Sequence, residues 1–322
     1  MIQGRRITVV VPAYSEQALI TKTLDGIPPE IDRVIVVDDA SPDRTAAIVS
    51  EREEARVALL RRERNGGVGA AIVSGYREFL RLEAATPGSD GLCVVMAGDA
   101  QMDPEDLPAL LRPILDDGVG YAKGNRLLTP DVRAVMPGAR YLGNIVFSSL
   151  TRIASGYWHI SDSQCGYTVI TREALCKLDL DSIYPRYGFP NDLLIRLNVA
   201  GVRACDVPVR AIYGDEKSGI RPWRVLPAIA SILWKGFWWR LWHRYVITTF
   251  HPLIVLYAVG FLLCATGVGG AIALSWSGID AEGAASPTTA LLPLLLVLVG
   301  VPFMVFAMRL DSRHNRHLKA AP

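Results

Sequence analysis

An acidic residue and an amide follow a short apolar run in the first third of the chain. The run Leu92–Met96 leads into Ala97-Gly98-Asp99-Ala100-Gln101 and then Met102-Asp103-Pro104. A buried strand that carries an aspartate at its C-terminal tip, with a helix start just beyond, is where α/β sheets place divalent metals and phosphorylated ligands. Asp99 and Gln101 offer two oxygen donors of the kind that Mg²⁺ and Mn²⁺ prefer. We therefore expect a metal-dependent phosphate site here.

The position two residues before Asp99 is Ala97, where a second carboxylate would strengthen such a site. Two protein oxygens still form a sufficient ligand set, because Mg²⁺ often takes only one or two carboxylates and completes its shell with substrate phosphates and water. A solvated turn at the end of a strand is the alternative interpretation of this segment.

Three other segments with polar or glycine residues also follow apolar runs. Pro12-Ala13-Tyr14-Ser15-Glu16 comes after Ile7–Val11, Asp38-Asp39 comes after Val34–Val37, and a glycine turn, Asn65–Ala71, comes after Val57–Leu60. Tyr14 could stack on a base, the two aspartates could accept hydrogen bonds from a ribose, and the turn would let the backbone approach a nucleotide. Taken singly, they also fit a surface loop, a helix-capping turn and a tight turn.

The elements that position these segments alternate over the first two hundred residues. Short β-branched runs alternate with helical patterns, which predicts βαβ units and a mostly parallel, Rossmann-like sheet. Open α/β sheets bind ligands at the edge formed by the C-terminal ends of their strands. Ser41-Pro42 predicts the start of a helix that runs to about Glu54. Further along, we expect a loop over Thr129–Gly138, helices over Tyr141–Ser155 and Pro190–Ala200, and a strand over Ala204–Val209.

Hydrophobic residues are concentrated near the C-terminus. The chain has 322 residues, of which 50% are hydrophobic, and its mean hydropathy is +0.25. His251–Trp276 and Pro287–Met308 contain no Lys, Arg, Asp or Glu. Each is long enough to cross a membrane, which takes about 20 residues. A soluble alternative would need two very long, fully buried helices. We therefore predict an α/β domain over 1–219, interface helices over 220–250 and a two-helix membrane anchor over 251–322.

The charges that flank the two apolar segments predict their orientation. The connecting loop carries only Asp280 and Glu282, whereas basic residues flank the outer ends. These basic residues are Arg240, His243, Arg244, Arg309, Arg313, Arg316 and Lys319. The positive-inside rule then places both termini and the α/β domain in the cytoplasm, at the inner membrane. Five tryptophans interleaved with cations over 222–250 are typical of helices in the membrane interface, although an amphipathic helix packed on the domain is the alternative.

Cysteine usage and net charge argue against a disulfide-bonded, a zinc-binding and a nucleic-acid-binding protein. The five cysteines form no CxxC pair, which fits reduced thiols in the cytoplasm rather than a disulfide framework or a zinc site. The net charge is only +2, and no nucleic-acid partner is expected. An assembly of identical copies, a homo-oligomer, is compatible with the sequence.

The motifs together resemble the family 2 glycosyltransferases with a GT-A fold, and within them the polyprenyl-phosphate glycosyltransferases. The resemblance rests on Val10–Glu16, Val36–Thr45, Asn65–Ala71 and Met96–Pro104, and it extends to Asp162–Tyr167 and Glu216–Ser218. Two C-terminal spans match the members that carry their own anchor. One departure concerns the family's acidic triplet, usually Asp-x-Asp, in which Ala97 replaces the first aspartate.

The resemblance implies a role for individual residues. Those that would hold the nucleotide sugar are Pro12, Tyr14, Glu16, Asp38, Asp39 and Gly69, with Asp99 and Gln101 binding the Mg²⁺ or Mn²⁺ that bridges its diphosphate. Those on the acceptor and phosphate side are Arg126, Arg140, Asp162, Gln164, Lys217, Ser218 and Arg221. Asp192 would be an acidic residue facing the acceptor. The expected catalytic set is Asp99, Arg126, Arg140 and Asp192.

The implied reaction is inverting transfer of a sugar from a nucleotide sugar to a polyprenyl phosphate at the cytoplasmic leaflet, with a UDP-sugar favoured over GDP-mannose. A phosphate monoester has a second pKa of about 6 and is mostly dianionic at neutral pH, so its attack needs little help from a base. Two alternatives remain: a membrane-anchored nucleotide-sugar-binding protein with little turnover, and a processive polysaccharide synthase. The synthases need more spans and usually a Gln-x-x-Arg-Trp motif, and this sequence has neither.

Overall fold

A computed structural model of the chain describes residues 1–86, 90–129, 132, 136, 138–210, 212, 222–247, 251–280 and 287–320, without the side chains of 139–140, 222–225, 277–280 and 287–290. The elements pack as two compact units. The first comprises Met1–Trp238 together with the residues from His317 onward, and the second is Trp239–Arg316. The chain therefore leaves the first unit, forms the second, and returns. The domain boundaries expected from the sequence stay a prediction.

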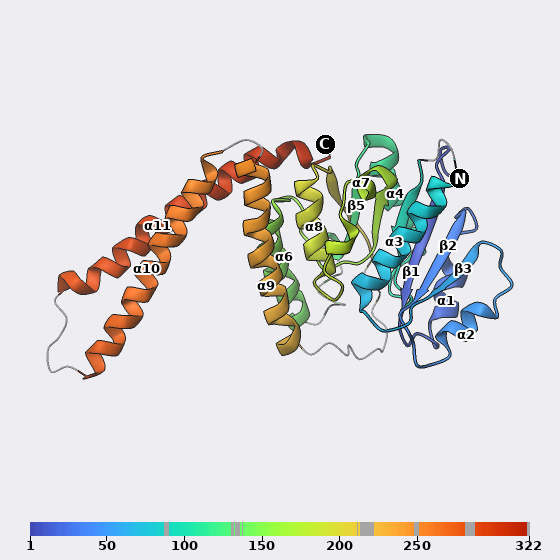
Figure 1. The fold of residues 1–322 in the computed structure, drawn as a ribbon, viewed down its shortest axis with the longest axis horizontal. Coiled ribbons are helices and arrows are strands. Elements are labelled where there is room, and N and C mark those ends of the chain that lie inside the picture. Colours follow the sequence, from blue (N-terminus) through green and yellow to red (C-terminus); the bar gives the residue numbers. More distant parts are fainter. Residues whose placement is uncertain are drawn as a thin grey trace. The chain divides into compact units, whose positions relative to one another are not determined.

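The first unit is built around one sheet, whose strands in the described part of the chain are ordered β3-β2-β1-β4-β6-β5-β7 (Figure 1). The strands are β1 Ile7–Ala13, β2 Arg33–Asp38, β3 Val57–Arg61, β4 Leu92–Val95, β5 Tyr121–Asn125, β6 Thr168–Thr171 and β7 Ala204–Pro208. β6 runs antiparallel to both of its neighbours, and the other pairs are parallel. The prediction of a mostly parallel, Rossmann-like sheet is confirmed.

Helices cover both faces of the sheet. The helices of the first unit are α1 Ile20–Gly26, α2 Thr45–Ser50, α3 Val68–Ala84, α4 Leu107–Asp117, α6 Gly138–Ser155, α7 Arg172–Cys176, α8 Phe189–Val199 and α9 Pro222–Leu241, the last of which extends into the second unit. One core cluster joins the sheet to α1, α2 and α4, and the other joins it to α3, α7 and α8. Strands buried on both faces, such as β1, therefore appear in the sequence as continuous apolar runs.

One predicted helix start is wrong. α2 begins at Thr45 rather than at Ser41, because the Asp43 side chain accepts hydrogen bonds from the Thr45 backbone at 3.1 Å and from its hydroxyl at 2.6 Å. Ser41 instead donates its backbone N–H to Asp38 at 3.3 Å. The N-cap is Arg44, which makes no side-chain cap hydrogen bond, so the Asp43 turn precedes the helix and Ser41 does not cap it.

The segment after the last helix returns to the first unit. A short 3₁₀ turn, Asn315–Leu318, follows α11, and Lys319 then forms a parallel β-bridge with Ala204 of β7. Leu318 is fully buried in the core cluster beneath α3 and α8, and Ala320 packs against the cluster on the other face. These residues are therefore part of the first unit's core.

Leu318→Ala should lower the free energy of unfolding of the first unit by about 2–5 kcal/mol, the usual loss for truncating a buried leucine. Leu142→Ala on α6 is the matched control, because Leu142 is 63% exposed. Denaturant unfolding of the purified full chain, followed by circular dichroism, measures both changes. Equal stability of the two variants would show that the returning segment is not part of the core.

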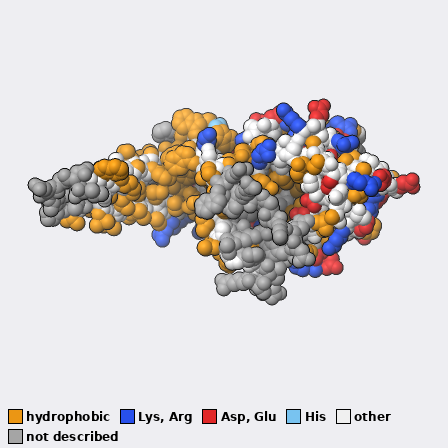
Figure 2. Space-filling model, turned by 90° about the horizontal axis from the view of Figure 1, so that it is seen from below, with side chains coloured by type: hydrophobic (Ala, Val, Ile, Leu, Met, Phe, Trp, Pro, Cys, Tyr) orange, Lys and Arg blue, Asp and Glu red, His pale blue; other side chains and the backbone are white. Residues whose placement is uncertain are grey.

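The second unit contains two long apolar helices. They are α10 Leu253–Asp280 and α11 Pro287–His314, preceded by a π-helical segment, Trp242–Ile247. Stretches long and apolar enough to cross a membrane run over Leu253–Trp276, within α10, and over Leu291–Leu318, which begins in α11 and includes the 3₁₀ turn after it. A Cβ atom on Gly260 would lie 3.1 Å from the carbonyl oxygen of Gly300, so glycine allows the two helices to approach closely. Figure 2 shows hydrophobic side chains over the surface of these helices, and most charged side chains on the first unit.

A buried ion pair lies within the second unit, near the end of α11. Arg240 donates to both oxygens of Asp311, at 2.9 and 3.0 Å, and neither side chain is exposed. Tyr245 donates its hydroxyl to Asp311 at 2.5 Å, and Asn315 donates to the same carboxylate at 2.9 Å. Arg240, expected from the sequence to be a flanking cation, is therefore neutralised by a carboxylate.

Candidate active site

One large cavity opens at the C-terminal edge of the sheet, with a volume of about 970 Å³. All four segments singled out from the sequence reach it, from the ends of β1 and β2, from the glycine turn before α3, and from the end of β4. The predicted site residues that line it are Pro12, Tyr14, Glu16, Asp39, Asp99, Gln101, Arg126 and Gln164. Alignment of parallel strands is what gathers groups from such distant parts of the chain.

Asp39 connects the end of β2 to the glycine turn. Its two carboxylate oxygens accept hydrogen bonds from the backbone of Gly66 at 3.1 Å and of Gly67 at 2.7 Å, and it also pairs with Arg62. Gly67 has a φ of +94°, a conformation that favours glycine. Tyr14 lines the same cavity and is 48% exposed, and an exposed aromatic ring is a group on which a base can stack.

Two predicted nucleotide-binding residues do not line the cavity. Asp38 is fully buried behind the strand end, where it accepts the Ser41 backbone. Gly69 lies at the contact between α3 and α8, because a Cβ atom there would come within 2.7 Å of Phe189. In this structure Asp38 and Gly69 therefore contact neighbouring protein groups at the C-terminal edge of the sheet and not the cavity.

The loop after β4 presents Asp99 and Gln101 to the cavity. The Gln101 backbone donates to Asp99 at 3.1 Å, which fixes the carboxylate at the start of the turn. Ser15, Ala40 and Ala100 all have positive φ, near 55°, in the turns that follow β1, β2 and β4. Left-handed non-glycine residues cost about 1–2 kcal/mol each. Three of them at neighbouring strand ends mark this edge as functionally constrained.

The oxygen donors in this loop suit a hard divalent cation. No group of three or more His, Cys, Asp and Glu side chains in the described residues is arranged to hold a metal ion. Asp99 and Gln101 would therefore bind Mg²⁺ or Mn²⁺ only together with phosphate oxygens, which is how Mg²⁺ is commonly held. At the position of the missing carboxylate, the Ala97 backbone faces the sulfur of Met102 at 3.3 Å.

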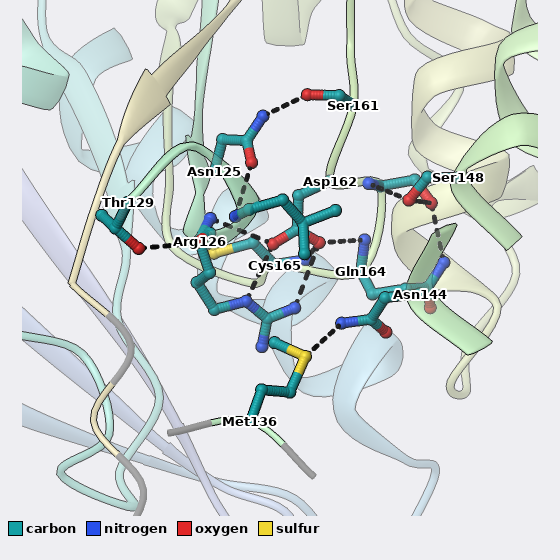
Figure 3. A network of polar contacts seen from close by, with 12 residues as sticks. Asn125, Arg126, Thr129, Met136, Asn144, Ser148, Ser161, Asp162, Gln164 and Cys165 are labelled. Carbon is teal, nitrogen blue, oxygen red and sulfur yellow. Dashed lines mark hydrogen bonds and ion pairs between the residues drawn. The ribbon is translucent and has the colours of Figure 1, made fainter. Parts of the chain in front are cut away.

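Arg126 follows β5 and is held by Asp162 (Figure 3). Its Nε donates to Oδ2 of Asp162 at 2.8 Å, its Nη2 donates to Oδ1 at 3.1 Å, and its backbone donates to Oδ2 at 3.2 Å. Arg126 lines the cavity, whereas Asp162 is fully buried behind it. Asp162, expected to line the sugar or acceptor pocket, thus lies behind the cavity wall and holds the arginine that lines it.

The Arg126–Asp162 pair is electrostatically matched. Burial alone would raise the pKa of Asp162, but the charge and hydrogen bonds of Arg126 outweigh it and hold that pKa below its ordinary value. Asp162 is therefore ionised at neutral pH. A bidentate, charge-assisted pair of this kind fixes the plane of the guanidinium, which then presents a defined face to phosphate oxygens.

Gln164 lines the cavity next to this pair. Its backbone donates to Asp162 at 3.1 Å, and its side-chain amide donates to Ser163 at 2.8 Å and to Asn191 of α8 at 2.9 Å. Figure 3 shows Arg126, which follows β5, beside Asp162 and Gln164 of the turn before β6. The turn before β6 is thus connected both to β5 and to the start of α8.

Asp192 lies outside the residues that line the cavity. Its Oδ2 accepts the backbone of Tyr184 at 2.8 Å and Nε of Arg196 at 2.9 Å, one helical turn away. Its carboxylate holds the loop before α8 to that helix. Of the other expected residues, Lys217, Ser218 and Arg221 lie outside the described residues, as does the side chain of Arg140 at the start of α6.

The cavity also contains residues that the sequence patterns did not single out. Lys123 on β5 is the main one, and Arg186 and Arg210 are further cations. The signal that could have found Lys123 is its spacing of three residues before Arg126, because the lysine itself interrupts the apolar pattern of β5. Arg210 bridges Glu105 at 2.9 Å and Asp106 at 3.0 Å, in the turn that follows the Asp99 loop.

Comparison with known proteins gives the same fold and points to the same kind of chemistry. A UDP-N-acetylglucosamine–dolichyl-phosphate N-acetylglucosaminyltransferase of Methanococcus voltae is 29% identical over 224 residues, which cover 65% of this chain and 86% of that protein. An undecaprenyl-phosphate mannosyltransferase of Micrococcus luteus is 32% identical, over 63% of this chain and 82% of that protein.

A solved structure is also similar. Glucosyl-3-phosphoglycerate synthase of Mycobacterium tuberculosis, in complex with Mn²⁺, UDP-glucose and phosphoglyceric acid, aligns with a TM-score of 0.51 and 25% identity, covering 74% of this chain and 80% of that one. The family model described as glycosyl transferase family 2 matches residues 8–178, which contain the described strand ends β1, β2 and β4, the glycine turn, Arg126 and Asp162. The chain therefore belongs to glycosyl transferase family 2.

Proposed function

We propose that this chain transfers a sugar from a nucleotide sugar, a UDP-sugar in preference to GDP-mannose, to a polyprenyl phosphate. The observation that carries the proposal is a single cavity that holds Asp99 and Gln101 at one strand end and an oriented Arg126 at another. Oxygen donors suit a metal-bound diphosphate, and a fixed guanidinium suits a second phosphate. Relatives named for transfer to dolichyl phosphate and undecaprenyl phosphate support this choice of acceptor.

In the proposed reaction an acceptor phosphate oxygen attacks C1 of the sugar. The new bond joins C1 to that oxygen, the bond from C1 to the donor phosphate breaks, and the nucleoside diphosphate leaves with inversion at C1. Bound Mg²⁺ or Mn²⁺ would neutralise charge on the leaving diphosphate. Arg126, held by Asp162, lowers the repulsion between two anionic phosphates as they approach each other.

The acceptor accounts for the two apolar helices. A polyprenyl phosphate stays in the bilayer because each buried CH₂ is worth about 0.8 kcal/mol. We propose that α10 and α11 span the membrane with both termini in the cytoplasm, which keeps the sugar-transferring unit at the leaflet that contains its acceptor. Their length and hydropathy, with windows averaging 2.1 and 2.6, support this arrangement.

A donor panel tests the proposal. The purified full chain in detergent micelles is incubated with a short polyprenyl phosphate, Mn²⁺, and UDP-glucose, UDP-N-acetylglucosamine or GDP-mannose in turn. Lipid-linked sugar from at least one UDP-sugar is the expected result. Donor binding without a lipid-linked product from any donor would instead identify a nucleotide-sugar-binding protein, and formation of long glycan would identify a polysaccharide synthase.

Asp192→Asn should reduce turnover by less than about 10-fold, because the acceptor phosphate needs no base and Asp192 is bound by Tyr184 and Arg196. Removing a true general base costs about 10²–10⁴-fold. Steady-state rates at saturating donor make the comparison. Asp181→Asn, at an exposed carboxylate, is the control. Complete loss of turnover with an unchanged unfolding midpoint would make Asp192 the base.

A further inference from the structure

Lys123 is a buried cation to which the proposed sugar transfer from the nucleotide sugar to the polyprenyl phosphate assigns no role. It lies in the middle of β5, none of its surface is exposed, and it lines the cavity. Its ammonium donates a hydrogen bond to the backbone carbonyl of Cys165. Removing a charge from water costs several kcal/mol even after the protein relaxes. A lysine at such a buried position therefore needs an interaction or a function that compensates this cost.

The two carboxylates whose charges act on Lys123, Asp162 and Asp206, do not accept its hydrogen bond. Asp162 binds Arg126 through both oxygens. Asp206 on β7 accepts the Asn125 amide at 2.5 Å and the Ser161 backbone at 2.6 Å, both through Oδ2. These two carboxylates compensate the charge of Lys123 through space. The hydrogen bond of Lys123 goes to the backbone carbonyl of Cys165, and a neutral donor could also make that bond.

Lys123 and Arg126 hold the two ends of one turn. Arg126 binds Asp162, at the start of the turn that leads into β6, and Lys123 binds the carbonyl of Cys165, three residues later. Gln164, which lines the cavity, lies between these two attachment points. Two cations three residues apart on and after β5 thus fix the Asp162–Cys165 turn against the sheet.

We propose that Lys123 is a positioning residue for the acceptor phosphate: it fixes the Cys165 end of this turn and adds positive charge beneath the place where the two phosphates meet. The proposal rests on the proposed function, and it names a part of the acceptor site that the motifs do not include. A neutral side chain of the same length would keep the packing and lose both the charge and the hydrogen bond.

The ionisation of Lys123 gives a pH signature. Burial lowers the pKa of the Lys123 ammonium below its ordinary value, against the raising effect of Cys165, Asp162 and Asp206, and Arg126 lowers it further. The charged form is therefore present at lower pH and is lost as pH rises through the lowered pKa. Acceptor use should then fall at alkaline pH, with a midpoint below the ordinary lysine value of about 10.4.

Lys123→Met tests the proposal. Lys177→Met is the matched control, because Lys177 is partly exposed and, among the described residues, its side chain pairs only with Glu173, four residues earlier. The kcat/KM for a short polyprenyl phosphate should fall by about 10²-fold in Lys123→Met, as for a small misplacement of a reacting group. UDP affinity and the unfolding midpoint should match those of the control. The alkaline fall in kcat/KM of the unsubstituted chain should be absent from Lys123→Met.

Three results would overturn the proposal. The first is an unchanged kcat/KM in Lys123→Met. The second is a fall in kcat/KM that comes with an equal fall in UDP affinity and with a lower unfolding midpoint, because loss of a purely structural lysine would affect all three. The third is a kcat/KM of the unsubstituted chain that does not fall at alkaline pH, a result that can be measured without any variant. Direct binding of the polyprenyl phosphate separates the two claims: if the unsubstituted chain binds it without transferring sugar, the proposed function fails, and weaker binding by Lys123→Met still supports the role of Lys123.

Discussion

Asp99→Asn is expected to reduce sugar transfer by about 10²–10³-fold, or roughly 3–4 kcal/mol of transition-state stabilisation. Asparagine keeps the shape of the side chain and can still accept the Gln101 backbone, which now donates to Asp99 at 3.1 Å. It removes the negative charge that would hold a divalent cation against the leaving diphosphate. Ala97 supplies no second carboxylate, and Asp103, further along the loop, pairs with Arg210 at 3.1 Å.

Initial rates over a range of Mn²⁺ concentrations measure this effect. The variant should need more Mn²⁺ for half-maximal rate and reach a lower maximum. Asp116→Asn is the control, because Asp116 lies on α4 in an i,i+4 pair with Arg112 at 3.4 Å. An Asp99→Asn chain with the control's rate and the control's Mn²⁺ dependence would remove Asp99 from the site.

Arg126→Lys is expected to lower kcat/KM for the polyprenyl phosphate by about 10²-fold, the equivalent of one or two charge-assisted hydrogen bonds. Lysine keeps the positive charge but cannot reproduce the fork that binds both oxygens of Asp162 at 2.8 and 3.1 Å. Its ammonium would therefore not be held in one orientation toward the acceptor. The loss should appear with the acceptor varied and the donor saturating.

Arg112→Lys on α4 makes the same exchange at an arginine whose side chain is 82% exposed, and it should leave the rate unchanged. Asp162→Asn provides a second comparison, because it leaves Arg126 in place and weakens its orientation. It should reduce acceptor use in the same direction as Arg126→Lys. Full activity in both Arg126→Lys and Asp162→Asn would mean that orientation of the guanidinium has no part in transfer.

The sequence predicts β1, β2 and β4, three strands that are buried on both faces. β1, β2 and β4 are continuous apolar runs, and the polar residues that follow each run, such as Asp39 and Asp99, reach one cavity. Parallel alignment explains this success, since it brings strand ends together without any need to know side-chain contacts. The C-terminal apolar helices are equally visible, because twenty or more residues without charge are rare elsewhere.

Other features depend on contacts through space. β5 is not predicted, because Lys123 and Gly124 interrupt its apolar pattern, and the antiparallel direction of β6 leaves no trace in periodicity. The partner of Arg126 is Asp162, 36 residues later, and only the folded sheet brings them together. Asp192 looks in the sequence like an acid that faces the acceptor, yet Arg196, one turn further along α8, takes up its carboxylate.

Sugar transfer to a polyprenyl phosphate is tested most directly by following both of its products, UDP and lipid-linked sugar, in one reaction. The purified full chain is supplied with a UDP-sugar, Mn²⁺ and a polyprenyl phosphate, and released UDP and lipid-linked sugar are quantified by mass spectrometry over time. Equal amounts of the two products are expected, and formation of both should depend on the polyprenyl phosphate and be abolished by a metal chelator. UDP release that does not depend on the polyprenyl phosphate, or donor binding with no lipid-linked sugar, would contradict the proposed function.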